Sequence, residues 1–258
     1  MGSGTLSGND NNDSSDQVTA MVLQSTPMGE YDRRVVLLTR QMGKISCFAR
    51  RARKQGSALM AATSPFAFGT FSLTKLRSGY IMTDADIDNY FAHLRDDVVT
   101  AYYGMYFLEV CEWVTRENND EAQILLLLYR CCQALQTGKI PNKLIRSVFE
   151  IKLVVIEGEF EGVPGSDDGP TNEQIYEQAN EQIYESTHEH GLSGFRHKYS
   201  AGMRQAVQFI ALSRIDNLFS FTVDKEVLNE LATFAAETVD NYCGKREFSS
   251  LDILKTII

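Results

Sequence analysis

The 258-residue sequence predicts an α+β protein in which a small N-terminal β-barrel precedes an all-helical C-terminal domain. Three observations lead to this class. Residues 18–83 alternate between apolar and polar side chains and carry Gly at the turns, which is typical of short strands. After Asp84 the apolar residues recur at helical spacing instead. The hydrophobic share of 43% is enough to bury a core in both parts.

The strands of the predicted barrel are short and are separated by turn residues. Pro27-Met28-Gly29 ends the first strand, Met42-Gly43 joins the second to the third, and Ser78-Gly79 precedes the fifth. The five strands are expected at 18–26, 33–40, 44–49, 66–75 and 80–83, with a helical turn at 57–63. This pattern and its basic rim favour a five-stranded OB-fold-like barrel over residues 18–84, with an SH3-like barrel or an open sheet as the alternatives.

The remainder of the chain, residues 85–258, is predicted to be the helical domain. Asp96-Asp97 start its first helix, Gly138 stops the second, and Asp224 caps the fifth. The helices are expected at 96–114, 124–136, 141–157, 199–213, 225–243 and 249–258. The third of these opens at Pro141, ends at Gly158 and turns four apolar residues inward, namely Leu144, Val148, Ile151 and Val155.

Two segments have compositions that set them apart from the domains. Residues 1–17 consist largely of Gly, Ser, Asn and Asp, so we expect a disordered tail. A Glu-rich insertion at about 162–190 contains the related segments NEQIYEQ (172–178) and NEQIYES (180–186). A period of eight is slightly more than two helical turns, so this repeat predicts one amphipathic helix rather than a solenoid.

Charge is distributed unevenly along the chain. The net charge is −9, yet residues 18–80 hold ten Lys or Arg and only two acids, Glu30 and Asp32. The stretch RRVVLLTRQMGKISCFARRARK (33–54) has eight basic residues and no acidic residue. Such an asymmetry favours a polyanionic partner for the N-terminal part over a small substrate.

No pattern of catalytic or metal-binding residues is recognisable. The sequence lacks a phosphate-binding P-loop, a nucleophile elbow and a zinc-protease helix motif, so catalytic residues and cofactors are not expected. Asp84–Asp88 begins like a calcium loop but has Asn89 where Gly is required, and is read as a polar linker. His188, His190 and His197 are weak metal candidates. The five cysteines, with no C-x-x-C pair, indicate a reduced protein with Cys in its core.

Basic residues and two aromatic residues of the barrel are the predicted nucleic-acid contacts. Lys and Arg neutralise phosphates, and exposed aromatic rings stack on bases. The DNA-binding set is Arg33, Arg34, Arg40, Lys44, Phe48, Arg50, Arg51, Arg53, Lys54, Phe71, Lys75 and Arg77. Core packing is the alternative role for Phe48 and Phe71.

Several segments resemble the RecO family of bacterial DNA repair proteins. They include GEYDRRVVLLTRQMGKISCFARRARK (29–54), SPFAFGTFSL (64–73), YYGMYFLEVCEWVTRENND (102–120) and VFEIKLVVIEGEF (148–160). The resemblance covers about residues 18–258 and is most specific in the N-terminal block. It implies an OB-fold, a helical domain and a non-enzymatic recombination mediator that binds single- and double-stranded DNA and anneals complementary strands.

The resemblance also implies partners. Members of the family work with RecR and with single-stranded DNA-binding protein (SSB) to load the RecA recombinase. The acidic, apolar-ended SSB tail is expected on the helical domain, where the candidate contacts are Arg116, Arg130, Lys143 and Arg146. Many members carry a four-cysteine zinc motif, but this chain has no Cys between Cys132 and Cys243, so no zinc is expected.

Location and two alternative functions follow from the same observations. The N-terminal residues lack the features of a secretory signal and no apolar run is long enough to span a bilayer, so a cytoplasmic bacterial protein without a membrane partner is expected, associated with the nucleoid when bound to DNA. An OB-fold RNA-binding factor and a protein-interaction adaptor are the alternatives. A metal-dependent nuclease is the least favoured class.

Overall fold

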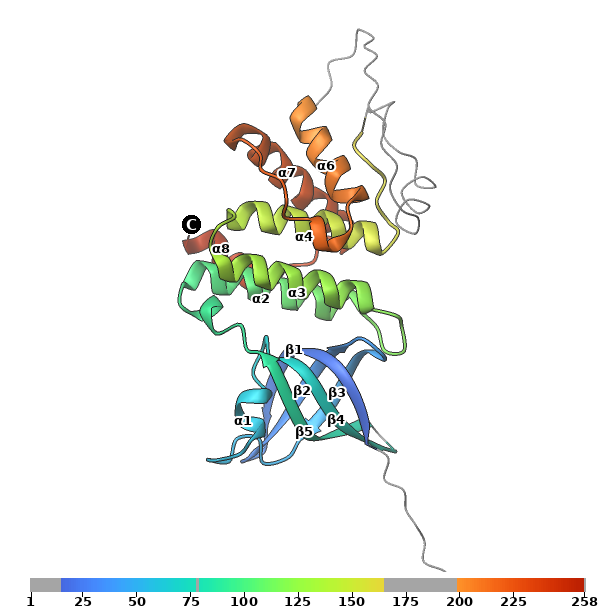
Figure 1. The fold of residues 1–258 in the computed structure, drawn as a ribbon, viewed down its shortest axis with the longest axis vertical. Coiled ribbons are helices and arrows are strands. Elements are labelled where there is room, and N and C mark those ends of the chain that lie inside the picture. The colour runs from blue at the N-terminus through green and yellow to red at the C-terminus, as the bar shows by residue number, and fades with distance from the viewer. Residues whose placement is uncertain (1–14, 78, 165–198, 258) are drawn as a thin grey trace, which may run out of the picture.

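A barrel and a helical domain are stacked end to end in the computed structural model, which describes residues 15–77, 79–164 and 199–257 (Figure 1). The predicted repeat helix at 172–186 and the metal candidates His188, His190 and His197 lie outside these residues. The strands are β1 (Asp16–Met28), β2 (Asp32–Thr39), β3 (Gly43–Ala49), β4 (Phe68–Leu76) and β5 (Gly79–Asn89), with the short helix α1 (Leu59–Ala62) between β3 and β4.

The five strands form a closed barrel in the order β1-β2-β3-β5-β4, which confirms the predicted OB-fold-like architecture. β1 closes the barrel because its first half pairs with β4 and its second half with β2. A bulge between Val22 and Gln24 marks the change of partner, and bulges increase the local bend of a strand. β3 and β5 pair in parallel through only three residue pairs, beginning at Cys47 and Tyr80.

Two strands are longer than predicted. β1 begins at Asp16, inside the predicted tail, and continues through Pro27 to Met28. β5 continues to Asn89, so the segment read as a polar linker is part of the barrel and crosses the predicted boundary at residue 84. β4 pairs with this acidic half of β5 through Gly69, where an added Cβ would lie 2.1 Å from the carbonyl oxygen of Asp86.

The described helices confirm the expected pattern, and three of them (α2, α6 and α7) begin at a side-chain cap, whereas α3 and α4 have no side-chain cap hydrogen bond. Asp97 accepts a hydrogen bond from the Thr100 amide, and Asp224 accepts one from the Val227 amide. Gly138 ends α3 in the left-handed conformation. The elements are η1 (Ala92–Arg95), α2 (Val98–Val114), α3 (Ala122–Thr137), α4 (Asn142–Ile156), α6 (Ala201–Leu212), η2 (Ile215–Asn217), α7 (Lys225–Tyr242) and α8 (Ser249–Ile257).

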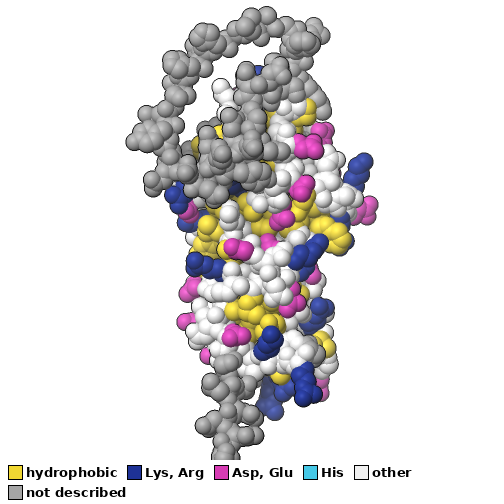
Figure 2. Space-filling view, turned by 90° about the vertical axis from the view of Figure 1, so that its right-hand side faces the viewer, with side chains coloured by type: hydrophobic (Ala, Val, Ile, Leu, Met, Phe, Trp, Pro, Cys, Tyr) yellow, Lys and Arg dark blue, Asp and Glu magenta, His cyan; other side chains and the backbone are white. Residues whose placement is uncertain are grey.

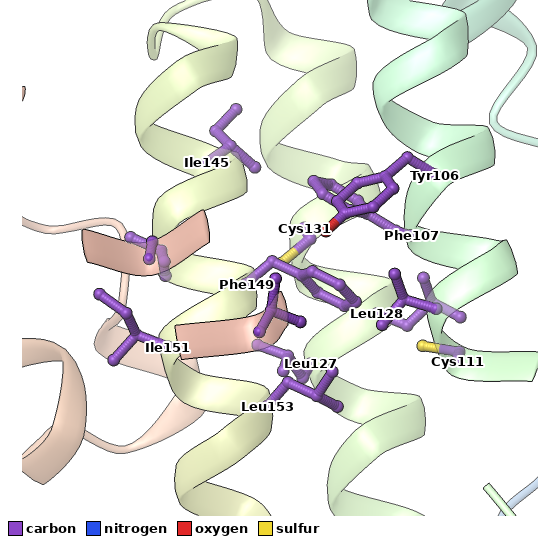
Figure 3. Close-up of a cluster of buried hydrophobic side chains, with 14 of the residues drawn as sticks. Tyr106, Phe107, Cys111, Leu127, Leu128, Cys131, Ile145, Phe149, Ile151 and Leu153 are labelled. Atoms are coloured by element: carbon purple, nitrogen blue, oxygen red, sulfur yellow. The ribbon is translucent and has the colours of Figure 1, made fainter. Parts of the chain in front are cut away.

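The helices are arranged in layers above the barrel. α2 and α3 lie next to the barrel, α4 lies above them, and α6 and α7 stand on the far side of α4 (Figure 1). The interior between α2, α3 and α4 is filled by large apolar side chains, including Phe107 and Phe149, whose ring centroids are 4.3 Å apart (Figure 3). All four residues of α4 predicted to face inward are buried.

One hydrophobic core joins the barrel to the helices. The inner faces of the strands enclose a separate cluster that includes Val35 and Leu37. Their neighbours Val36 and Leu38 point outward, yet they are equally buried because they belong to the same cluster as the side chains of α2, α3 and α4. The outer surface of β2 at this end therefore forms part of the domain interface.

Backbone contacts reinforce this interface at the β2–β3 turn. Gly43 forms an isolated β-bridge with Glu117, and the Lys44 amide donates to the Arg116 carbonyl at 2.9 Å. Gly43 has a φ of +67°, and an added Cβ would lie 2.3 Å from the same carbonyl oxygen. Only glycine suits both the conformation and the close approach.

Candidate nucleic-acid interface

The basic residues of the barrel separate into three groups. One group lies where β2 begins and β3 ends, and we name it the basic cluster: Arg33, Arg34, Arg50, Arg51, Arg53 and Lys54. A second group, Lys75 and Arg77, lies on the β4–β5 hairpin, which Figure 1 places on the opposite side of the lower end of the barrel. The third group, Arg40 and Lys44, flanks the β2–β3 turn beside the helices.

The loop of the basic cluster is anchored from several directions. The methyl group of Ala52 is fully buried and joins the core inside the barrel, while the side chains on both sides of it are exposed. The Arg53 amide donates to the Tyr31 carbonyl at 2.8 Å, and the Lys54 amide donates to the Arg51 carbonyl at 3.0 Å. These contacts hold four basic side chains, those of Arg50, Arg51, Arg53 and Lys54, on the solvent side of one short loop.

The two arginines at the start of β2 differ in accessibility. Arg33 is half-buried, and its Nη1 donates to the Met60 carbonyl at 3.1 Å and to Thr63 Oγ1 at 2.7 Å. It therefore secures α1 against the barrel. Arg34 is exposed, and its Nε donates to Ser46 Oγ at 2.8 Å, which leaves the rest of the guanidinium group facing solvent.

Within the described residues, the charged side chains of the basic cluster form no ion pair with an acidic side chain. Lys75 and Arg77 are exposed and likewise have no ion-pair partner in that part of the chain. On the face drawn in Figure 2, Lys and Arg side chains gather at the lower end of the barrel. Cations grouped in this way repel one another and attract a polyanion.

The two predicted aromatic contacts have opposite environments. Phe48 is 37% exposed on the outer surface, opposite Arg34 on β2 and beside Ile81 on β5. Its ring can therefore reach a base that lies next to the basic cluster. Phe71 is fully buried in the barrel interior, so a base-stacking role for Phe71 is excluded by its position.

Lys44 also lies away from the DNA-binding surface that the sequence predicted for it. Its Nζ donates to the backbone carbonyl of Glu112 at the end of α2. Burial, together with the nearby positive charge of Arg116, lowers the pKa of Lys44. Lys44 thus connects the barrel to the helical domain, away from the basic cluster. Arg40 is exposed next to the same turn.

The four basic residues predicted to meet a partner protein each contact a different neighbour. Arg116 donates to three carbonyls at the end of α2, and Arg130 pairs with Asp216 at 2.6 Å. Lys143 donates to Asn229 at 2.7 Å. Arg146 pairs with the buried Glu150 at 2.7 Å and lies over the Tyr106 ring. The structure therefore distributes these residues over several helix contacts and does not gather them in one free basic patch.

Two residues of the interface were missed by sequence reasoning. Asp32 accepts a hydrogen bond from the Arg51 amide through Oδ1 at 2.8 Å. A lone acid just before a basic run was the only available signal. Ala52 was missed as an anchor, although a small apolar residue between basic pairs indicates that the chain turns inward there.

Metal binding, the cysteines and the capacity of helices to span a membrane are the other features of interest within residues 15–77, 79–164 and 199–257. No group of three or more His, Cys, Asp or Glu side chains in these ranges could hold a metal ion. All five cysteines are buried and free, as the sequence suggested, and burial raises their pKa values. None of the helices described there is long and apolar enough to cross a bilayer.

The fold and the site together define a class of protein: a closed OB-type barrel with a cationic outer surface, joined to a helical domain. Residues 15–91 match the family model described as Recombination protein O N terminal, and residues 95–252 match Recombination protein O C terminal. The chain therefore belongs to the RecO family of DNA repair proteins.

Individual relatives agree with this assignment. The DNA repair protein RecO of Alkaliphilus metalliredigens is 26% identical over 238 residues, which cover 92% of this chain and 97% of the relative. RecO of Acetivibrio thermocellus is 26% identical over 244 residues, or 93% and 96% of the two chains. RecO of Caldicellulosiruptor bescii is 30% identical over 140 residues, or 54% and 57%.

Proposed function

We propose that this chain is a non-enzymatic recombination mediator that binds DNA through the basic cluster and anneals complementary strands. The observation that carries the proposal is the set of exposed cations on one anchored loop, which lack ion-pair partners among the described residues. Each phosphate contact made by such a side chain releases condensed counter-ions, which favours binding. Neutralising two strands at one surface lowers their mutual repulsion while bases pair.

Phe48 supplies a second kind of contact in this proposal. Its exposed ring lies beside Arg34, so a backbone phosphate can meet the guanidinium while an unpaired base stacks on the ring. In this proposal Lys75 and Arg77, on the opposite hairpin, contact the second strand or a continuing duplex. Neither binding nor annealing in this form requires nucleotide hydrolysis or a metal ion.

The partners proposed for the chain are RecR and SSB, with RecA loaded as the result. We assign the SSB tail to the helical domain, because an acidic peptide with an apolar end requires a cation beside an apolar surface. Arg116, Arg130, Lys143 and Arg146 remain the proposed contacts. Each would have to exchange an internal hydrogen bond for the peptide carboxylates.

Salt dependence of DNA binding tests the proposal. The triple variant Arg50→Ala, Arg51→Ala, Arg53→Ala removes up to three phosphate contacts, so the slope of log affinity against log salt should fall by roughly 0.7–0.9 for each of them. The matched control replaces Lys139, Arg214 and Lys225, which are exposed on the helical domain, and removes the same charge. An unchanged slope in the triple variant, with a normal thermal melt, would contradict DNA binding at the basic cluster.

Strand annealing on SSB-coated DNA, with and without RecR, tests the mediator role itself. The wild type and the helical-domain control should anneal, and the triple variant should anneal more slowly. Parallel titrations with RNA of the same sequence separate this proposal from an OB-fold RNA-binding factor. A protein-interaction adaptor would show little binding to either nucleic acid.

A further inference from the structure

Asp32 stands out because it is an acid in contact with the loop of the basic cluster. It occupies the first position of β2, and its Oδ1 accepts a hydrogen bond from the Arg51 backbone amide at 2.8 Å. Asp32 has no ion-pair partner in the described part of the chain. A carboxylate at this position should repel a phosphate backbone, so its charge alone disfavours the proposed DNA binding.

The backbone at Arg51 explains what the hydrogen bond does. Arg51 has a φ of +56°, in the left-handed region that a residue with a Cβ rarely adopts. The bond from its amide to Asp32 and the bond from the Lys54 amide to its carbonyl hold the residue in this conformation on both sides. The reversal of the chain here is what turns Ala52 into the barrel and leaves its basic neighbours in solvent.

We propose that Asp32 is a positioning residue for DNA binding, which acts through the backbone of Arg51. Its carboxylate fixes the loop so that the guanidinium groups of Arg50, Arg51 and Arg53 are already arranged when a phosphate backbone arrives. A preorganised site loses less conformational freedom on binding, and this gain outweighs the unfavourable charge of the acid. The inference rests on the proposed DNA binding at the basic cluster.

Three substitutions separate positioning from charge. Asp32→Asn keeps an acceptor oxygen and removes the charge, so it should bind DNA as tightly as the wild type or more tightly. Asp32→Ala removes both, and should weaken DNA binding by about 3- to 10-fold because one hydrogen bond that orders the site is absent. Asp32→Glu keeps the charge but displaces the oxygen, and should also weaken binding. If Asp32 is a positioning residue, Asp32→Asn should retain the DNA affinity of the wild type and Asp32→Ala should not.

Hydrogen exchange at the Arg51 amide provides a readout that does not depend on DNA. Protection of this amide should fall in Asp32→Ala and should persist in Asp32→Asn. The inference is overturned if Ala and Asn both bind DNA more tightly than the wild type, or if Glu binds as the wild type does. Should Asp32→Ala fail to fold, Asp32→Glu and Asp32→Asn decide the question by themselves.

The triple arginine variant distinguishes failure of this inference from failure of the proposed function. In one outcome, the triple variant loses DNA affinity while the affinities of the Asp32 variants change only as expected from the loss or retention of the negative charge. That result would support DNA binding at the basic cluster and contradict the positioning role of Asp32. If the triple variant binds DNA as the wild type does, the proposed site itself is wrong.

Discussion

At the scale of single residues, Arg51 combines an unfavourable backbone conformation with an exposed positive charge. Glycine adopts a positive φ readily, whereas a residue with a Cβ pays about 1–2 kcal/mol for it. Arg51→Gly relieves this strain, but glycine loses more backbone conformational entropy on folding, which offsets part of the gain. The net increase in the free energy of unfolding should be about 0.5–1 kcal/mol. The same change should reduce the salt slope of DNA binding by roughly 0.7–0.9. Urea unfolding and DNA titrations measure the two effects.

Arg51→Ala is the matched control for this prediction. It removes the same charge and keeps a Cβ in the left-handed conformation, so the salt slope should fall without a gain in stability. Equal stabilities of the Gly and Ala variants would show that the backbone conformation of Arg51 carries no energetic cost.

Lys152 is a buried cation whose ionisation should appear in the pH dependence of stability. It is 5% exposed, and its Nζ donates to the carbonyls of Ala211 and Ser213 at 2.9 and 2.8 Å. Burial lowers its pKa from 10.5 to about 8. Between these two values the unfolded chain binds more protons at this group than the folded chain does. The contribution of Lys152 to the free energy of unfolding therefore rises with pH through this window.

Comparison with Lys152→Met isolates this contribution, because the other titrating groups are common to both proteins. The stability of the wild type relative to the variant should increase from about pH 8 to about pH 10.5, the window between the folded and the unfolded pKa. Urea unfolding at several pH values provides the measurement, and Lys139→Met, an exposed lysine on the same domain, controls for net charge. A difference that is constant or decreasing with pH would contradict the burial of a charged Lys152.

At the scale of elements, the β2–β3 turn decides how the barrel meets the helices. Gly43 and Gly29 both have a positive φ, but only Gly43 has a neighbour, the Arg116 carbonyl, in the space of a Cβ. Gly43→Ala should destabilise the protein by about 2–4 kcal/mol, because strain and a backbone clash add together. Gly29→Ala carries the conformational strain alone and should cost about 1–2 kcal/mol. Equal losses in urea unfolding would show that the turn can move away from Arg116.

The elements also show how far local pattern predicts structure. Caps and glycines placed the helix ends at Asp97, Gly138 and Asp224 because these signals act within one turn of the chain. The second half of β5 was missed because its acids read as a linker. It is a strand because β4 is available to pair with it along its whole length. Pairing partners distant in sequence cannot be read from a local pattern.

At the scale of the whole molecule, the shared core predicts that the barrel and the helices unfold together. Leu37 points into the barrel and Leu38, its neighbour, points into the cluster shared with the helices. Leu37→Ala should lower stability by about 2–5 kcal/mol. Leu37 belongs to the barrel cluster, but its replacement should affect both domains equally. The unfolding midpoint reported by Trp113 on α2 should fall as much as the midpoint reported by amides of the barrel. Leu38→Ala is the matched control, since it must affect both signals.

Two separate transitions in the Leu37→Ala protein would contradict this prediction. In that case the interface at β2 would be too weak to couple the domains, and the barrel would behave as an independent unit. Trp113 is well suited to the measurement because it is the only tryptophan of the chain.

The sequence by itself determined the class, the element order, the chemistry of the basic cluster and the family resemblance, because these depend on residue types and short-range spacing. Only the tertiary structure decided which of those side chains reach solvent. In the run Val35-Val36-Leu37-Leu38 all four residues are buried, two inside the barrel and two under the helices, so no alternation marks the exposed face. The same long-range packing buries Phe71, exposes Phe48 and directs Lys44 to α2. Accessibility is a property of neighbours distant in sequence, and closure of the barrel against the helical domain supplies those neighbours.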